Sequence, residues 1–120
     1  MGILNWIKNR IHSILVLIIS FIPFSWNMFK YPYYENDEAV YVIRGYELAN
    51  FGNLDHWTYW YDHAPGATYL MALWYKVVPD FLNIGNFIDS ARVLMLIIHL
   101  LTALLLYKLV VRIIDNKAAG

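Results

Sequence analysis

Residues 91–114 read ARVLMLIIHLLTALLLYKLVVRII and form a long apolar stretch. A helix built from it, rising about 1.5 Å per residue, would cross a bilayer core of about 30 Å with some tilt. Arg92 lies at its beginning. Lys108 and Arg112 lie near its end, four residues apart on one face, where long basic side chains can snorkel to the nearby interface. The stretch therefore predicts a membrane-spanning helix.

A second apolar segment, residues 11–29, carries no formally charged residue. As a helix it would be about 28 Å long, close to the thickness of a bilayer core. Lys8 and Arg10 precede it, as basic residues precede the apolar region of a signal peptide. The residues around Pro23 and Trp26, however, offer no small-x-small cleavage site. We therefore favour an uncleaved first span, which Pro23 should kink or end.

The composition agrees with a membrane environment. Hydrophobic residues make up 60% of the 120 residues and charged residues 15%, whereas soluble domains are about 45–50% apolar. The formal net charge of +0 gives no general attraction to nucleic acid, so nucleic acid is not an expected partner. The absence of cysteine excludes disulfides, thiolate metal sites and cysteine nucleophiles.

Charge also predicts the topology. Segment 30–90 contains three basic residues and eight acidic ones. Basic residues gather instead at the outer ends of the two apolar segments: Lys8, Arg10, Lys108, Arg112 and Lys117. Because basic flanks stay in the cytoplasm, both termini should be cytoplasmic and loop 30–90 extracytoplasmic.

The loop should contain a first surface helix over residues 37–50. Asn36 can cap it, Asp37 and Glu38 suit the positive end of the helix dipole, and Gly52 can end it. Its expected apolar stripe consists of Ala39, Ile43 and Tyr46.

A second helix should begin at Pro65, because proline suits a first helical position, and should stop before Pro79. Its expected apolar stripe, which should lie along the membrane surface, consists of Tyr69, Leu70, Leu73, Trp74 and Val77. Residues 80–89 should form a loop into the second span. The predicted fold is an all-α integral membrane protein, residues 1–120, with spans at about 11–29 and 91–114 joined by a loop with two amphipathic surface helices.

The loop carries the candidates for chemistry. Asp37 and Glu38 are adjacent, so on a helix they point about 100° apart and cannot flank one bond as paired carboxylates. At most one should act as an acid or base, and the alternative is that both only favour the helix N-terminus. The group Asp55, His56, Asp62 and His63 offers ligands for a divalent metal without a strict metal-site spacing, so a metal there stays an open alternative. His99, inside the second span, is either functional or a neutral imidazole bonded to a neighbouring helix.

Two motifs follow each other in the loop. They are Asn36-Asp37-Glu38, followed by Tyr41, Gly45, Leu48, Ala49 and Gly52, and then Tyr61-Asp62-His63-Ala64-Pro65-Gly66. In this order they resemble the first external loop of GT-C fold glycosyltransferases. The likeness is to the branch of protein mannosyltransferases and lipid A aminoarabinose transferases, in which an Asp-Glu pair opens a surface helix after the first span.

The resemblance implies a polyprenyl-phosphate-linked sugar as donor and a glycan, lipid or protein as extracytoplasmic acceptor. Asp37 matches the acid that deprotonates or orients the acceptor hydroxyl, and Glu38 matches a supporting acid. Asp62 and His63 fall near the lipid phosphate, and Pro65 with Gly66 fixes that turn. Ala64 and His63 depart from the family's proline and lysine.

Members of that family have many more spans, so we expect this chain to be the N-terminal portion of a larger enzyme, an early-terminated gene product or a separately encoded subunit. It should be inactive without the remaining helices or a partner subunit. The alternative is a small two-span scaffold or accessory subunit without catalysis.

Overall fold

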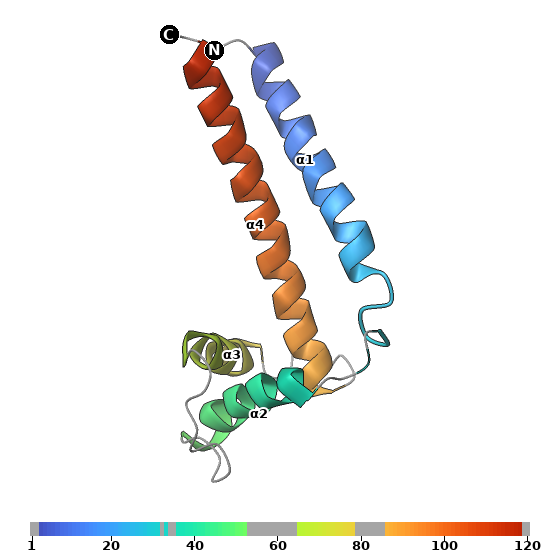
Figure 1. Cartoon of the computed structure of the whole chain (residues 1–120), viewed down its shortest axis with the longest axis vertical. Helices are drawn as coiled ribbons and strands as arrows, with labels where there is room; N and C mark the ends of the chain where they lie inside the picture. The colour runs from blue at the N-terminus through green and yellow to red at the C-terminus, as the bar shows by residue number, and fades with distance from the viewer. Residues whose placement is uncertain (1–2, 32, 34–35, 53–64, 79–85, 119–120) are drawn as a thin grey trace. The chain divides into compact units, whose positions relative to one another are not determined.

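The computed structural model describes residues 3–31, 33, 36–52, 65–78 and 86–118. Four helices and no strand lie within these residues: α1 (Ile3–Ser25), α2 (Asn36–Phe51), α3 (Pro65–Val77) and α4 (Phe87–Ala118) (Figure 1). The chain divides into two compact units. The helical-pair unit comprises Met1–Trp26 and Met95–Gly120, and the loop unit comprises Asn27–Leu94. The all-helical prediction is confirmed for the described part of the chain.

α4 contains the predicted apolar span. Its stretch Phe87–Ile114 has 28 residues and is long and apolar enough to cross a membrane. The helix begins earlier than predicted, because the Asn86 side-chain Oδ1 accepts the backbone N–H groups of Ile88 and Asp89 at 2.9 and 3.0 Å. A capping asparagine of this kind satisfies donors that the first helical turn leaves unpaired. The expected loop over 80–89 is therefore wrong from Phe87 onward.

α1 ends at Ser25, short of the predicted end at residue 29. Two residues later Asn27 adopts the left-handed conformation with φ of 57°, and its carbonyl accepts the N–H groups of Lys30 and Tyr31, both at 2.9 Å. The described apolar helix Arg10–Ser25 is about 24 Å long, less than a bilayer core. Among the described residues, α4 is the one helix that meets both length and composition for a span.

Within the helical-pair unit, α1 and α4 meet through aromatic rings. Phe24 and His99 are stacked, with ring centroids 3.7 Å apart and an angle of 29° between the planes. The buried Nε2 of His99 has no hydrogen-bond partner in the described part of the chain. His99 therefore contacts the neighbouring helix through its ring face, and not through a hydrogen bond from Nε2.

α2 ends as predicted at Gly52, which has a φ of 75° and donates its N–H to the carbonyl of Leu48 at 3.2 Å. A left-handed glycine is a common way to end a helix. In the predicted apolar stripe of α2, Ile43 and Tyr46 are exposed and Ala39 is half-buried. The buried residues of α2 are Val42, Arg44 and Gly45.

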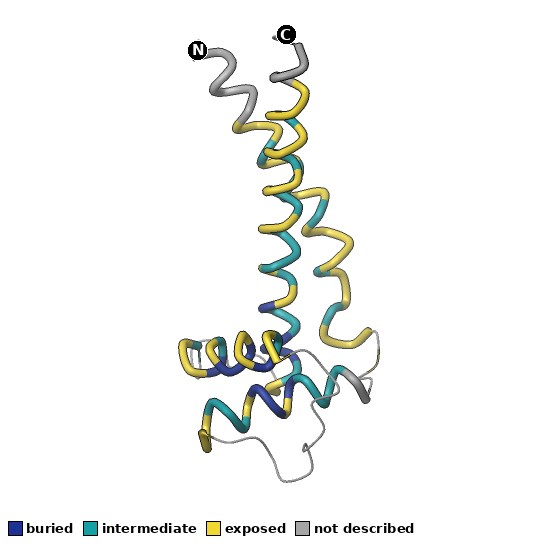
Figure 2. The backbone as a smooth tube through the Cα atoms, turned by 60° about the vertical axis from the view of Figure 1, so that its left-hand side comes forward, coloured by how far each residue is buried: buried dark blue, intermediate teal, exposed yellow. Residues whose placement is uncertain are grey.

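α3 begins at Pro65 as predicted, and Val77 is its last residue. Its predicted apolar stripe faces outward: Tyr69, Leu70, Leu73 and Val77 are exposed, and Trp74 is half-buried. The opposite side is buried and consists of Thr68, Met71, Ala72 and Tyr75. α2 and α3 are neighbours, and Figure 2 shows the buried residues of both helices in dark blue.

The close approach of α2 and α3 depends on Gly45. A Cβ atom added at Gly45 would overlap the Cβ of Met71 and lie 3.3 Å from the backbone nitrogen of Ala72. Beside this contact Tyr46 meets Tyr75 edge to face, with ring centroids 5.8 Å apart. The absence of a side chain at residue 45 is therefore what allows the two helices to pack.

We expect Gly45→Ala to lower the free energy of unfolding of the loop unit by about 1–3 kcal/mol, the usual cost of overpacking. Gly66→Ala is the matched control, because no atom of the described residues lies within 4 Å of a Cβ built there, apart from its chain neighbours and its own helix backbone. Hydrogen exchange of the α2 and α3 amides in detergent micelles measures both variants. Equal protection in the two variants would contradict the packing described.

Candidate functional site

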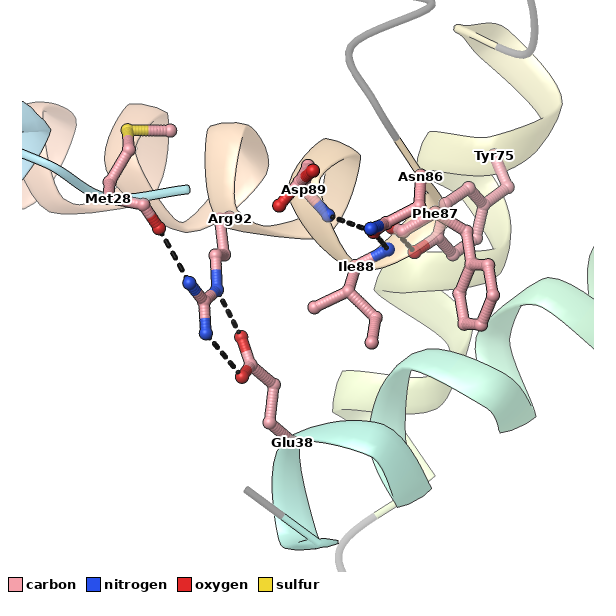
Figure 3. Close-up of polar contacts among 8 residues, drawn as sticks. All are labelled: Met28, Glu38, Tyr75, Asn86, Phe87, Ile88, Asp89 and Arg92. Atoms are coloured by element: carbon pink, nitrogen blue, oxygen red, sulfur yellow. Dashed lines mark hydrogen bonds and ion pairs between the residues drawn. The ribbon is translucent and has the colours of Figure 1, made fainter. Parts of the chain in front are cut away.

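The contact that organises the candidate site joins Arg92, in the second turn of α4, to Glu38, in the first turn of α2 (Figure 3). Arg92 Nε donates to Glu38 Oε1 at 2.7 Å, and Arg92 Nη2 donates to Glu38 Oε2 at 2.8 Å. Two parallel, charge-assisted bonds of this kind fix orientation as well as distance. The beginning of α2 is thereby attached to the beginning of α4 within the loop unit.

Arg92 also binds the segment that follows α1. Its Nη1 donates to the backbone carbonyl of Met28 at 2.6 Å. All three nitrogens of the guanidinium thus donate to acceptors on two other parts of the loop unit. A lysine could not reproduce this fork, because its ammonium is a single point donor.

The ion pair with Arg92 favours a structural role for Glu38. Both carboxylate oxygens of Glu38 accept bonds from Arg92, and the side chains of Arg92 and Glu38 are only 10% and 27% exposed. A carboxylate held in this way suits positioning better than proton transfer. Asp37 precedes it in the first turn of α2, and the placement of the Asp37 side chain lies outside what the structure describes.

Two hydrogen bonds attach α3 to the first turn of α4. Trp74 Nε1 donates to Ser90 Oγ at 3.0 Å, and the Tyr75 hydroxyl donates to the backbone carbonyl of Phe87 at 2.6 Å. Burial raises the pKa of Tyr75 well above its usual value of 10, so the phenol stays protonated and can donate this bond. The first two turns of α4 therefore form hydrogen bonds with both α2 and α3.

The predicted donor-binding residues fall in two groups. Pro65 and Gly66 open α3 and are exposed. Asp62 and His63, together with the metal candidates Asp55 and His56, lie outside the described residues. Within the described ranges, no group of three or more His, Asp or Glu side chains is arranged to hold a metal ion.

The role of Arg92 is not predicted by the sequence pattern, which marks this residue only as the boundary of the apolar stretch. The available signal is its place directly before residues 93–107, which carry no formal charge. A charged group at such a boundary is costly to bury unless it has partners. Its partner Glu38 is 54 residues away in sequence, so local patterns cannot identify it.

The chain matches no protein-family model, no curated protein and no solved structure.

We expect Arg92→Lys to destabilise the loop unit by about 1.5–3 kcal/mol, because the fork to Glu38 and the bond to Met28 cannot both be kept. Arg112→Lys makes the same change at an exposed position of the same helix and should alter stability by less than about 0.5 kcal/mol. Urea unfolding in detergent micelles, followed by tyrosine and tryptophan fluorescence, measures both. Equal effects of the two substitutions would show that the fork contributes nothing.

Proposed function

We propose that the loop unit is the catalytic-loop portion of a membrane glycosyltransferase that moves a sugar from a polyprenyl-phosphate donor to an extracytoplasmic acceptor. The proposal keeps the topology expected from charge, with both termini cytoplasmic and two spans. The acceptor is a glycan, a lipid or a protein, and the other helices of the enzyme or a partner subunit complete the site.

The observation that supports the proposal best is the attachment of Glu38 to Arg92 directly after Asp37. It fixes the first turn of α2 against the beginning of a helix able to span a membrane. A base that acts on a lipid-linked substrate needs a rigid support at the membrane boundary, because misplacement of a catalytic group by about 1 Å can cost a factor of about 10² in rate. Asp37 occupies such a support, and the resemblance gives the same residue the acidic role.

In the proposed reaction the Asp37 carboxylate takes the proton of the acceptor hydroxyl. The hydroxyl oxygen then forms a bond to the anomeric carbon, and the bond from that carbon to the phosphate oxygen breaks. The lipid phosphate leaves with the bonding electron pair. Glu38 acts as a positioning residue through Arg92, which separates the roles of two adjacent acids that cannot flank one bond.

Asp62, His63, Pro65 and Gly66 would form the donor side of this site. The turn at Pro65 and Gly66 is exposed at the beginning of α3, where a phosphate could approach the backbone N–H groups of the first helical turn. A protonated His63, or a divalent metal near Asp62 and His63, would stabilise the charge that develops on the leaving phosphate.

The test is Asp37→Asn introduced at the native gene. Asparagine keeps the size of the side chain and can still cap a helix, but it cannot take a proton. We expect single-turnover transfer from a labelled polyprenyl-phosphate sugar, to acceptors on the outer face of right-side-out vesicles, to fall by about 10² to 10⁴. Donor binding should change little, because the base acts on the acceptor in the transition state.

Glu38→Gln is the matched comparison and should lower transfer less, because its effect is indirect. Near-normal transfer by Asp37→Asn would make Asp37 a helix-terminal residue only, and the scaffold alternative would then be the better account. Transfer found only on the cytoplasmic face would instead overturn the topology.

A further inference from the structure

The exposed side of α3 is more apolar than is usual for a helix on the surface of a water-soluble protein. Its buried side is mixed, with the apolar Met71 and Ala72 beside Thr68 and Tyr75. Its exposed side includes Leu70, Leu73 and Val77, which are 42%, 60% and 70% exposed. In water this arrangement would leave aliphatic surface hydrated that could have been buried. The exposed side of α3 is therefore suited to an apolar surrounding.

The place of α3 indicates what that surrounding is. Trp74 and Tyr75 are hydrogen-bonded to Ser90 and Phe87, in the first turn of the helix that is able to span a membrane. The first residues of a spanning helix lie at the boundary between headgroups and acyl chains. α3 is thus attached at the depth where an amphipathic helix buries its apolar side about 5–10 Å into the lipid.

The two loop helices differ in charge. α2 carries four charged residues, Asp37, Glu38, Arg44 and Glu47, whereas α3 carries only Lys76, in its last turn. Charged groups are costly in an acyl environment, but a lysine near the end of a helix can extend its ammonium to the headgroups. Only α3 has a composition that lipid would accept.

We infer that α3 is the lipid-contacting helix of the loop unit, that Leu70, Leu73 and Val77 enter the interface of the bilayer, and that α2 packs on the other side of α3 without entering lipid. This inference separates two helices for which the sequence predicted the same surface role. It depends on the packing and charge of the loop unit, and is independent of the proposed catalysis.

The chain has no cysteine, so single cysteines report position without background. The full chain carrying Leu73→Cys or Val77→Cys is labelled with a fluorophore in vesicles of phosphatidylcholine and phosphatidylglycerol. Asn50→Cys, at an exposed position of α2, is the matched control. Both positions of α3 are exposed, so the substitutions disturb no buried contact.

We expect nitroxide-labelled lipid to quench the probes at 73 and 77 several-fold more than the probe at 50, and iodide in the water to show the reverse order. Quenching of all three probes by iodide alone would overturn the inference, because α3 would then lie in water. Protection from both quenchers, increasing with the protein-to-lipid ratio, would overturn it as well, because a second copy of the chain would then cover this side. Strong lipid quenching at 50 would contradict the separate role of α2.

Discussion

The guanidinium of Arg92 is the group on which the loop unit depends. It lies in the second turn of a helix whose next fifteen residues carry no formal charge, where an unpaired charge would be costly. The two oxygens of Glu38 and the carbonyl of Met28 satisfy it, at 2.6 to 2.8 Å. These acceptors lie on α2 and in the segment just after α1. The contacts that satisfy the Arg92 charge therefore also fix the position of the first turn of α2 within the loop unit.

The rest of the loop unit is arranged around the same helix beginning. Trp74 and Tyr75 bind the first turn of α4 from α3, and Gly45 lets α2 approach α3 at Met71. Each contact uses a residue that could not be exchanged for a similar one: a planar fork, an indole N–H, a phenol or a missing side chain. The result is a firmly held α2 whose first turn contains Asp37, the residue to which the proposed chemistry assigns proton transfer.

The sequence predicts some of these features and not others, for physical reasons. The span in α4 and the turns at Gly52 and Pro65 follow from length, composition and backbone preference, which are local properties. The buried sides of α2 and α3 do not, because they depend on how the two helices pack on each other, which is not a local property of either sequence. On α3 the apolar residues Leu73 and Val77 face outward, as expected if the solvent there is lipid. The partner of Glu38 cannot be predicted either, since it lies 54 residues away. The cap at Asn86 is not predicted, because a single capping residue has a weak pattern.

A double-mutant cycle on Arg92 and Glu38 tests the central claim most directly. Arg92→Gln, Glu38→Gln and the double variant are compared with the unaltered chain by urea unfolding in detergent micelles. If the fork organises the loop unit, the two substitutions should be coupled by about 1.5–3 kcal/mol, with Arg92→Gln the more damaging because it also loses the carbonyl of Met28. Effects that add to within about 0.5 kcal/mol would mean that the two side chains do not stabilise each other, and would contradict the account.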